Sequence, residues 1–170
     1  IVAGNAFRYE KLGIVPVAVV DEDCSDYSAL LLERLNGKEG LGLSLVDRET
    51  AAAMLENNEV EHVFIVKKGF EEAIRREETE GLIELVSSAS SYSADYASEV
   101  VAGEAMRIIT ANMAANNVSA LYKELGIEKG SGFWDEVYSY ANALWEPEPL
   151  MTINYKELKG GAVEQVSQAM

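Results

Sequence analysis

A buried strand that stops in a run of acidic residues most constrains the fold of this chain. Residues 15–20 read Val-Pro-Val-Ala-Val-Val, and three acidic residues follow at 21–23. A short apolar run bounded by turn residues is typical of a central strand covered on both faces. Ser25 can cap a following helix, with Asp26 in the first turn, where the helix dipole favours negative charge. Because sites in α/β folds usually lie where such strands end, this stretch is the first place to look for chemistry.

The rest of the first half alternates between helix and strand patterns. Apolar residues recur either at helical spacing or in strand-like runs, with turn residues between them. The predicted helices span residues 26–35, 48–57 and 71–76, and the predicted strands span residues 41–46, 60–66 and 82–86. Such alternation favours a sheet with parallel strands that is covered by helices.

The second half has a different character. A serine-rich stretch predicts a loop at residues 87–93, and long helical patterns follow. The predicted elements are a helix over 93–125, a helix over 133–145 and a strand over 150–155. Pro147 ends the second of these helices, because proline cannot continue a helix.

These elements predict an α/β fold, with α+β as the alternative. We expect a mixed, partly parallel sheet of about five strands covered by helices, with a long helix in the C-terminal half. The expected organisation is a single domain over residues 1–159, a helical subdomain over about 92–146 and a polar linker over 160–170. The chain begins at Ile1, and we expect it to be a fragment of a longer protein.

The net charge of the chain argues against one class of partner, nucleic acid. Its 29 acidic and 14 basic residues give a formal net charge of −15. A nucleic-acid surface needs clustered lysine and arginine, so the composition argues against a nucleic-acid partner. The single cysteine, Cys24, which we expect to be partly buried at the strand end, allows no disulfide within the chain. No segment approaches the roughly 18 apolar residues that span a bilayer.

Asp21 and Asp23 form a candidate metal site. Two carboxylates at a strand end could bind Mg²⁺ together with waters. An Asp-x-Asp pair after an apolar strand also resembles the phosphotransferase hydrolases that use an aspartate nucleophile, and receiver domains carry acidic residues at the same place. Both resemblances fail on later parts: Lys67 rather than an aspartate follows the strand at 60–66, and no later strand ends in an acidic pair. We therefore favour a solvated turn that caps a helix.

The other polar candidates carry weaker signals. His62 is the only histidine and has no metal-ligand residues beside it except Glu61. Lys67 and Lys68 could contact an anion, but two lysines at a strand end are more often a solvated turn. The serines at 87–93 contain no Gly-x-Ser-x-Gly elbow, so nothing in the sequence activates a hydroxyl. The sequence assigns no catalytic residue, no cofactor and no metal ligand.

The densest group of aromatic residues lies in the helix predicted over 133–145. Trp134, Tyr138 and Trp145 could pack this helix onto the domain. They could instead present an amphipathic contact to a ligand or to membrane-embedded segments of a partner. We favour core packing, because aromatic stripes at helical spacing usually face inward.

The strand-to-helix segment at residues 17–28, with the leucines that follow it, resembles the extracytoplasmic domain of bacterial type-2 ABC exporter permeases. Residues 46–51 resemble the second strand and helix start of that family. Residues 63–70 are similar to its strand that ends in a proline-lysine-glycine-phenylalanine turn, with Lys67 where proline is common. A long helix then follows the serine-rich loop, as in the family. The detailed resemblance covers about residues 14–91, and the rest agrees in layout.

This resemblance implies a non-enzymatic domain on the extracytoplasmic side of the cell membrane. In the family, the domain is inserted between the first and second membrane helices of the permease. The implied partners are those membrane helices, a separate cytoplasmic ATPase subunit, an export substrate that the sequence does not identify and, where permeases are coupled, a second permease. Because the ATPase subunit hydrolyses ATP, the resemblance implies no nucleotide site in this chain.

The residues of the shared motif are then expected to be structural. We expect Asp23 and Ser25 to serve as turn and cap, Gly69 to supply backbone freedom and Phe70 to anchor the core. Two other functions stay open. One is an extracytoplasmic sensor domain of a membrane receptor, and the other is a Mg²⁺-dependent phosphatase that uses Asp21 and Asp23.

Overall fold

The computed structural model describes residues 13–88, 91, 93–145, 155–159 and 162–166 of the protein. Two compact units divide the chain, Ile1–Met113 and Ala114–Met170. The boundary between them falls within one long helix, α5 (Ala94–Glu124).

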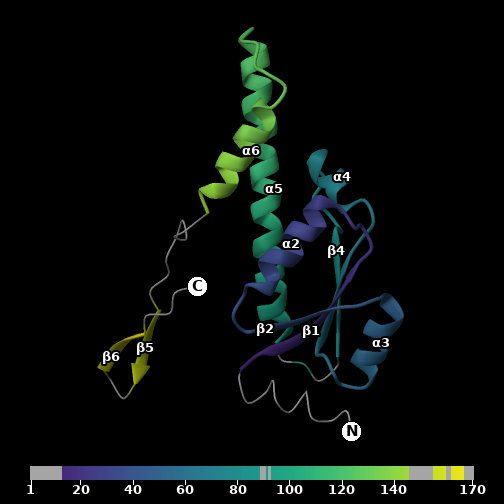
Figure 1. The fold of residues 1–170 in the computed structure, drawn as a ribbon. Helices are drawn as coiled ribbons and strands as arrows, with labels where there is room; N and C mark the ends of the chain where they lie inside the picture. The colour runs from purple at the N-terminus through teal and green to yellow at the C-terminus, as the bar shows by residue number, and fades with distance from the viewer. Residues whose placement is uncertain (1–12, 89–90, 92, 146–154, 160–161, 167–170) are drawn as a thin grey trace. The chain divides into compact units, whose positions relative to one another are not determined.

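The first unit is built on a four-stranded sheet (Figure 1). Its strands are β1 (Val15–Asp21), β2 (Leu41–Leu45), β3 (His62–Val66) and β4 (Ile83–Ser87), in the spatial order β2-β1-β3-β4. β1 runs parallel to β2 and to β3, whereas β4 is antiparallel to β3. The two central strands, β1 and β3, are apolar on both faces, which fits strands covered from two sides.

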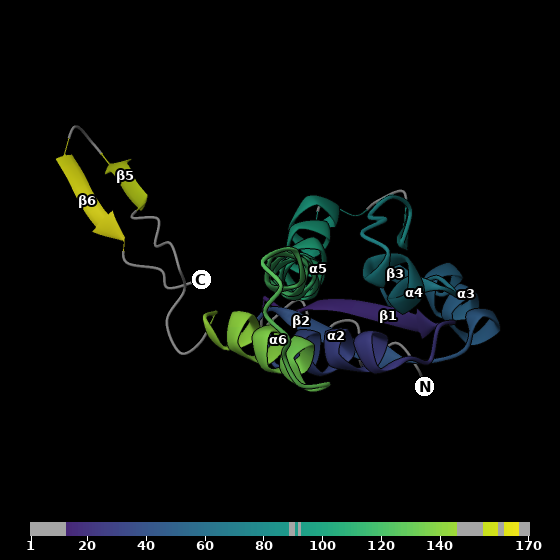
Figure 2. The same cartoon turned by 90° about the horizontal axis from the view of Figure 1, so that it is seen from above.

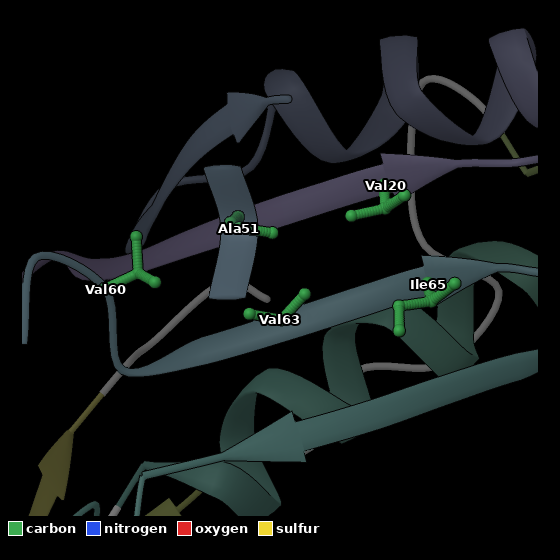
Figure 3. Packing of buried hydrophobic residues seen from close by; sticks show 6 residues of the cluster. Val20, Ala51, Val60, Val63 and Ile65 are labelled. Carbon is green, nitrogen blue, oxygen red and sulfur yellow. The ribbon is translucent and has the colours of Figure 1, made fainter. Parts of the chain in front are cut away.

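Helix α3 (Arg48–Glu56) covers one face of the sheet (Figure 3). Ala51 of α3 is 1% exposed and packs with apolar side chains of β1 and β3. The buried cluster on this face consists of Ala18, Val20, Ala51, Val60, Val63 and Ile65. The alternation of side chains along a strand assigns the intervening residues to the opposite face.

That opposite face carries α2 (Asp26–Asn36), α4 (Phe70–Arg75) and the part of α5 that ends at Met113 (Figures 1 and 2). A buried asparagine of α5, Asn112, joins these three helices. Its side-chain carbonyl accepts a hydrogen bond from the hydroxyl of Tyr27 at 3.3 Å, and its amide donates to the backbone carbonyl of Ile74 at 2.8 Å. The long helix is therefore attached to the first unit by polar as well as apolar contacts.

The second unit contains the end of α5, helix α6 (Phe133–Ala143) and a separate two-stranded hairpin. The hairpin strands are β5 (Tyr155–Lys159) and β6 (Ala162–Val166), which pair antiparallel. α5 and α6 are joined by a glycine-containing loop, and side chains of the two helices contact each other near that loop.

The α/β fold predicted from the sequence is confirmed. Within residues 13–145, every predicted helix and strand is present, with ends that agree to within two residues. The mixed sheet contains four strands rather than about five. The strand predicted over 150–155 lies outside the described residues except for Tyr155, and strand β6 forms within the segment predicted as a linker. Among the described residues, none of the helices has both the length and the apolar character that crossing a membrane requires.

Candidate functional site

The carboxyl ends of β1 and β3 lie side by side at the centre of the sheet. β2 pairs with one edge of β1, and β3 pairs with the other edge. Ligands of open α/β sheets bind at such a reversal of strand order. Six of the residues singled out from the sequence meet at this end of the sheet: Asp21, Asp23, Ser25, Lys67, Gly69 and Phe70.

The carboxylate of Asp21 organises the turn that starts α2. One oxygen accepts hydrogen bonds from the backbone N–H groups of Asp23 and Cys24, each at 3.0 Å, and the other accepts the hydroxyl of Ser28 at 2.8 Å. Ser25 is the N-cap of α2, as predicted. Its hydroxyl accepts the N–H of Ser28, and the hydroxyl of Ser28 accepts the N–H of Ser25, which completes a capping box.

The carboxylate of Asp23 points at the start of a different helix, α4. Its oxygens accept the backbone N–H groups of Gly69 at 2.6 Å and Glu71 at 3.0 Å. Glu71 returns the contact, because its carboxylate accepts the N–H of Tyr27 in the first turn of α2 at 3.2 Å. Gly69 has φ of +87°, a left-handed conformation that favours glycine, and the next residue, Phe70, is 1% exposed. Gly69 and Phe70 therefore have the expected roles, whereas Asp23 caps α4 rather than the helix that follows it in the chain.

These contacts hold the site in its charged form. Burial alone would raise the pKa of Asp23, but hydrogen bonds from Ser25 and from backbone amides at the start of α4 keep it below the ordinary value of 3.8. Burial would likewise raise the pKa of Glu71. The guanidinium of Arg75 and the amide of Tyr27 instead hold it below the ordinary 4.5. Both carboxylates are therefore ionised at neutral pH and stabilise helix N-termini.

An open depression of about 600 Å³ lies beside this network. Its lining mixes both signs of charge and consists of Asp23, Ser25, Lys68, Gly69, Glu71, Glu72 and Arg75. The carboxylates of Asp21 and Asp23 already accept hydrogen bonds on both oxygens. In the part of the chain that the structure describes, no group of three or more His, Cys, Asp or Glu side chains is placed to hold a metal ion. The arrangement joins two loops.

Two neighbouring residues point outward. The ammonium of Lys67 lies 3.6 Å from the carboxylate of Glu84 on β4, with both side chains about half exposed. Cys24 is exposed, not partly buried as expected, and it has a positive φ of 51°. The correction has a simple cause: Asp21 binds the Cys24 N–H, so this residue is held in a tight turn outside the sheet.

A second polar cluster, at the opposite end of β3, was missed by the sequence analysis. His62 is fully buried, and its ring nitrogens contact the hydroxyl of Ser87 at 3.0 Å and the hydroxyl of Ser93 at 2.9 Å. The hydroxyls of Ser91 and Ser93 both donate to the carboxylate of Glu61. Because Ser93 uses its proton on Glu61, it accepts from Nε2–H of His62, and Ser87 donates to Nδ1.

This cluster ties the sheet to the start of α5. The backbone carbonyl of Ser93 accepts the N–H of Ala97, the first bond of that helix. Burial lowers the pKa of His62, and the nearby carboxylate of Glu61 opposes that effect only in part. The histidine is therefore neutral at pH 7. Neither partner serine is identifiable from local patterns, because a serine-rich composition predicts a loop without showing which groups its hydroxyls contact.

The aromatic residues of α6 belong to the second unit. The indole N–H of Trp134 donates to the side-chain carbonyl of Asn116 at 2.8 Å, and its ring stacks on Tyr138 with centroids 5.3 Å apart. No α6 residue is fully buried. Trp145 follows the end of α6 and is half-buried. Trp134 and Tyr138 are half-buried, and Trp134 packs α6 onto the end of α5, while the alternative contact with a ligand or a partner stays a prediction.

Comparison with known proteins returned no matching family model, no matching curated protein and no matching solved structure.

Proposed function

We propose that this chain is a non-enzymatic extracytoplasmic domain of an ABC exporter permease. The observation that carries the proposal is that the motif residues have structural roles. Asp23, Ser25 and Gly69, on which the resemblance to that family rests, fasten the starts of α2 and α4 to each other. A motif that fixes backbone geometry marks a shared fold, whereas a catalytic motif would present free polar atoms to a substrate.

The state of the carboxylates favours this proposal over a phosphatase. A Mg²⁺-dependent phosphatase needs carboxylate oxygens that are available to the metal and to the phosphoryl group. In this chain the oxygens of Asp21 and Asp23 accept backbone N–H and hydroxyl donors instead. ATP hydrolysis would be carried out by a separate cytoplasmic subunit. The role of this domain would be to shape the exit path, to engage substrate or to contact partner proteins.

Cys24 offers a direct test of the location. It is exposed and is the only cysteine in these 170 residues. We would treat intact cells that express the full-length parent protein with a membrane-impermeant maleimide and compare the parent with its Cys24→Ser variant. The proposal predicts labelling that the variant loses. Labelling of Cys24 only after the cells are lysed would place the domain in the cytoplasm and contradict the proposal.

The parent protein distinguishes an exporter from a sensor. For an exporter permease we expect one membrane helix before this domain and about five after it, each of about 20 apolar residues. We also expect an ATPase subunit to copurify with the parent. One membrane helix on each side and a signalling module beyond would establish a receptor instead. Phosphoester turnover that Asp21→Asn abolishes would establish the phosphatase.

A further inference from the structure

The tip of the α5–α6 hairpin holds an ammonium group over two aromatic rings. The rings of Tyr122 and Phe133 have centroids 4.9 Å apart and planes tilted by 57°. The Nζ atom of Lys129 lies 4.8 Å from the centroid of Tyr122 and 5.2 Å from that of Phe133. Both distances lie within the ~6 Å over which a ring face attracts a cation. The two rings therefore form a cation site, and a lysine of the same chain fills it.

A depression of about 600 Å³ surrounds this ring pair, and Trp134 and Ser119 also line it. Small-molecule sites usually enclose about 300 to 1,000 Å³. Ser119 lies one helical turn before Tyr122, so their side chains share one face of α5. The hydroxyl oxygen of Ser119 is buried and has no hydrogen-bond partner among the described residues. The site thus places ring faces beside a buried hydroxyl that lacks a hydrogen-bond partner within the described residues.

The loop that carries Lys129 allows this lysine to leave. It contains Gly126, Gly130 and Gly132, and a Cβ atom added at any of the three would meet no other atom within 4 Å. Gly126 also has a positive φ of 70°. Since glycine leaves the backbone free to change conformation and no packing holds these positions, Lys129 can be displaced with little disturbance of the helices.

We propose that the aromatic site, formed by Tyr122 and Phe133, binds an organic cation with a quaternary ammonium head, and that Lys129 occupies the site when no ligand is bound. A lysine ammonium is strongly hydrated. A quaternary ammonium has no N–H group to keep solvated, so it gains more from contact with the ring faces. This inference does not depend on the proposed function.

Choline is a suitable probe because it joins a quaternary ammonium to a hydroxyl that Ser119 could bind. We would titrate it at constant ionic strength into the 170-residue chain and follow the indole N–H signal of Trp134 by NMR. The chain has two tryptophans, and Trp145→Phe assigns the signal. The expected result is a saturable shift. The neutral isostere of choline, in which carbon replaces nitrogen, should produce a shift only at far higher concentration.

Variants identify the site. Lys129→Ala removes the competing ammonium, so choline affinity should rise by about twofold to fivefold, as expected for an exposed cation–π contact. Tyr122→Leu removes one ring and should lower affinity by at least that factor. Lys68→Ala makes the same charge change in the first unit and should leave affinity unchanged. Lys129→Ala deletes no buried contact, which keeps the test valid if Tyr122→Leu fails to fold.

Three results would overturn the proposal. Equal binding of choline and its neutral isostere would show an apolar hollow without a cation site. Choline affinity that is the same in the unmodified chain and in Lys129→Ala would show that Lys129 does not occupy the binding position. No saturable shift in either protein would show that the rings serve only to pack the hairpin.

Discussion

Asp23 and Glu71 form a reciprocal pair of caps: Asp23 caps α4, which contains Glu71, and Glu71 caps α2, which follows Asp23 in the chain. Asp23, in the loop before α2, accepts the N–H groups of Gly69 and Glu71 at the start of α4. Glu71, in the first turn of α4, accepts the N–H of Tyr27 at the start of α2. The first N–H groups of a helix have no partner within the helix. The loops after β1 and β3 therefore cannot separate without leaving amides of both helices unpaired.

The first prediction concerns the stability that Asp23 contributes. Asp23→Ala removes the acceptor of two backbone amides and should lower the free energy of unfolding by about 1–2 kcal/mol in urea. Asp23→Asn keeps one acceptor oxygen, so its free energy of unfolding should lie between those of the unmodified protein and Asp23→Ala. Glu33→Ala, an exposed change on α2, is the matched control and should stay within about 0.5 kcal/mol. A loss in the control equal to that of Asp23→Ala would contradict the capping role.

The second prediction is a loss of stability in acid. The folded-state pKa values of Asp23 and Glu71 lie below the ordinary values of 3.8 and 4.5. An unfolded chain then binds more protons than the folded one, so stability falls as the pH decreases. The stability that the two carboxylates contribute is fully present when the pH is above their ordinary pKa values. It is lost as the pH falls through their lowered folded-state pKa values. Urea unfolding between pH 6 and pH 3 (roughly the range of carboxylate titration) should show a shallower decline for Asp23→Asn.

The third prediction concerns His62. Its folded-state pKa lies below the ordinary 6.5 because of burial, so protonation favours the unfolded chain. Stability should be complete above pH 6.5 and should decrease below it until the folded histidine itself is protonated. His62→Gln keeps a polar side chain without this titration. Its unfolding free energy should decline less over that interval than that of the unmodified protein, since only the carboxylates still titrate. An unchanged slope in the variant would assign the effect to other groups.

The sequence predicted the elements of the first unit well because its local signals agree with one another. The apolar runs of β1 and β3, the cap at Ser25 and the glycine before Phe70 all act over a few residues. The contacts that join distant segments were not predictable in the same way. Asp23 and Gly69 are 46 residues apart, and His62 and Ser93 are 31 apart. Such pairs depend on strand order, which periodicity does not specify.

Helix α6 is a second case in which local patterns predict the element but not its contacts. The spacing of Trp134 and Tyr138 predicts an inward-facing stripe, but it does not predict that Trp134 contacts Asn116 at the end of α5. Periodicity reveals that residues share a helix face, and it does not reveal what that face contacts. The contact of Lys129 with two rings was missed for a related reason, since Lys129 lies in a loop and meets both rings only once the hairpin has formed.

The fourth prediction separates backbone strain from crowding at two glycines. Gly40 and Gly69 have nearly equal φ values of +86° and +87°. A Cβ at Gly40 would lie 2.5 Å from the hydroxyl oxygen of Tyr96, whereas one at Gly69 would meet nothing within 4 Å. Gly69→Ala should therefore cost only the strain, about 1–2 kcal/mol. Gly40→Ala should cost more and should lose the Tyr96 contact to the carbonyl of Glu39. Equal losses of unfolding free energy would show that the ring of Tyr96 moves freely.

The fifth prediction concerns Asn112, the buried side chain that joins three helices of the first unit. It is 0% exposed and satisfies the hydroxyl of Tyr27 and the carbonyl of Ile74. Asn112→Ala removes the hydrogen bonds to the Tyr27 hydroxyl and the Ile74 carbonyl and opens a small cavity, although that carbonyl keeps the N–H of Glu77. We expect a loss of about 2–4 kcal/mol in unfolding free energy. Asn117→Ala, on an exposed part of the same helix, should change it by less than about 0.5 kcal/mol.

A double-mutant cycle tests whether Asn112 acts through Tyr27. Tyr27→Phe removes only the hydroxyl and should cost about 1 kcal/mol by itself. In the Asn112→Ala background the same change should cost much less, because the hydroxyl has already lost its acceptor. Fully additive losses in urea unfolding would show that the two side chains stabilise the protein independently. The buried asparagine would then stabilise the protein through the carbonyl of Ile74 rather than through Tyr27.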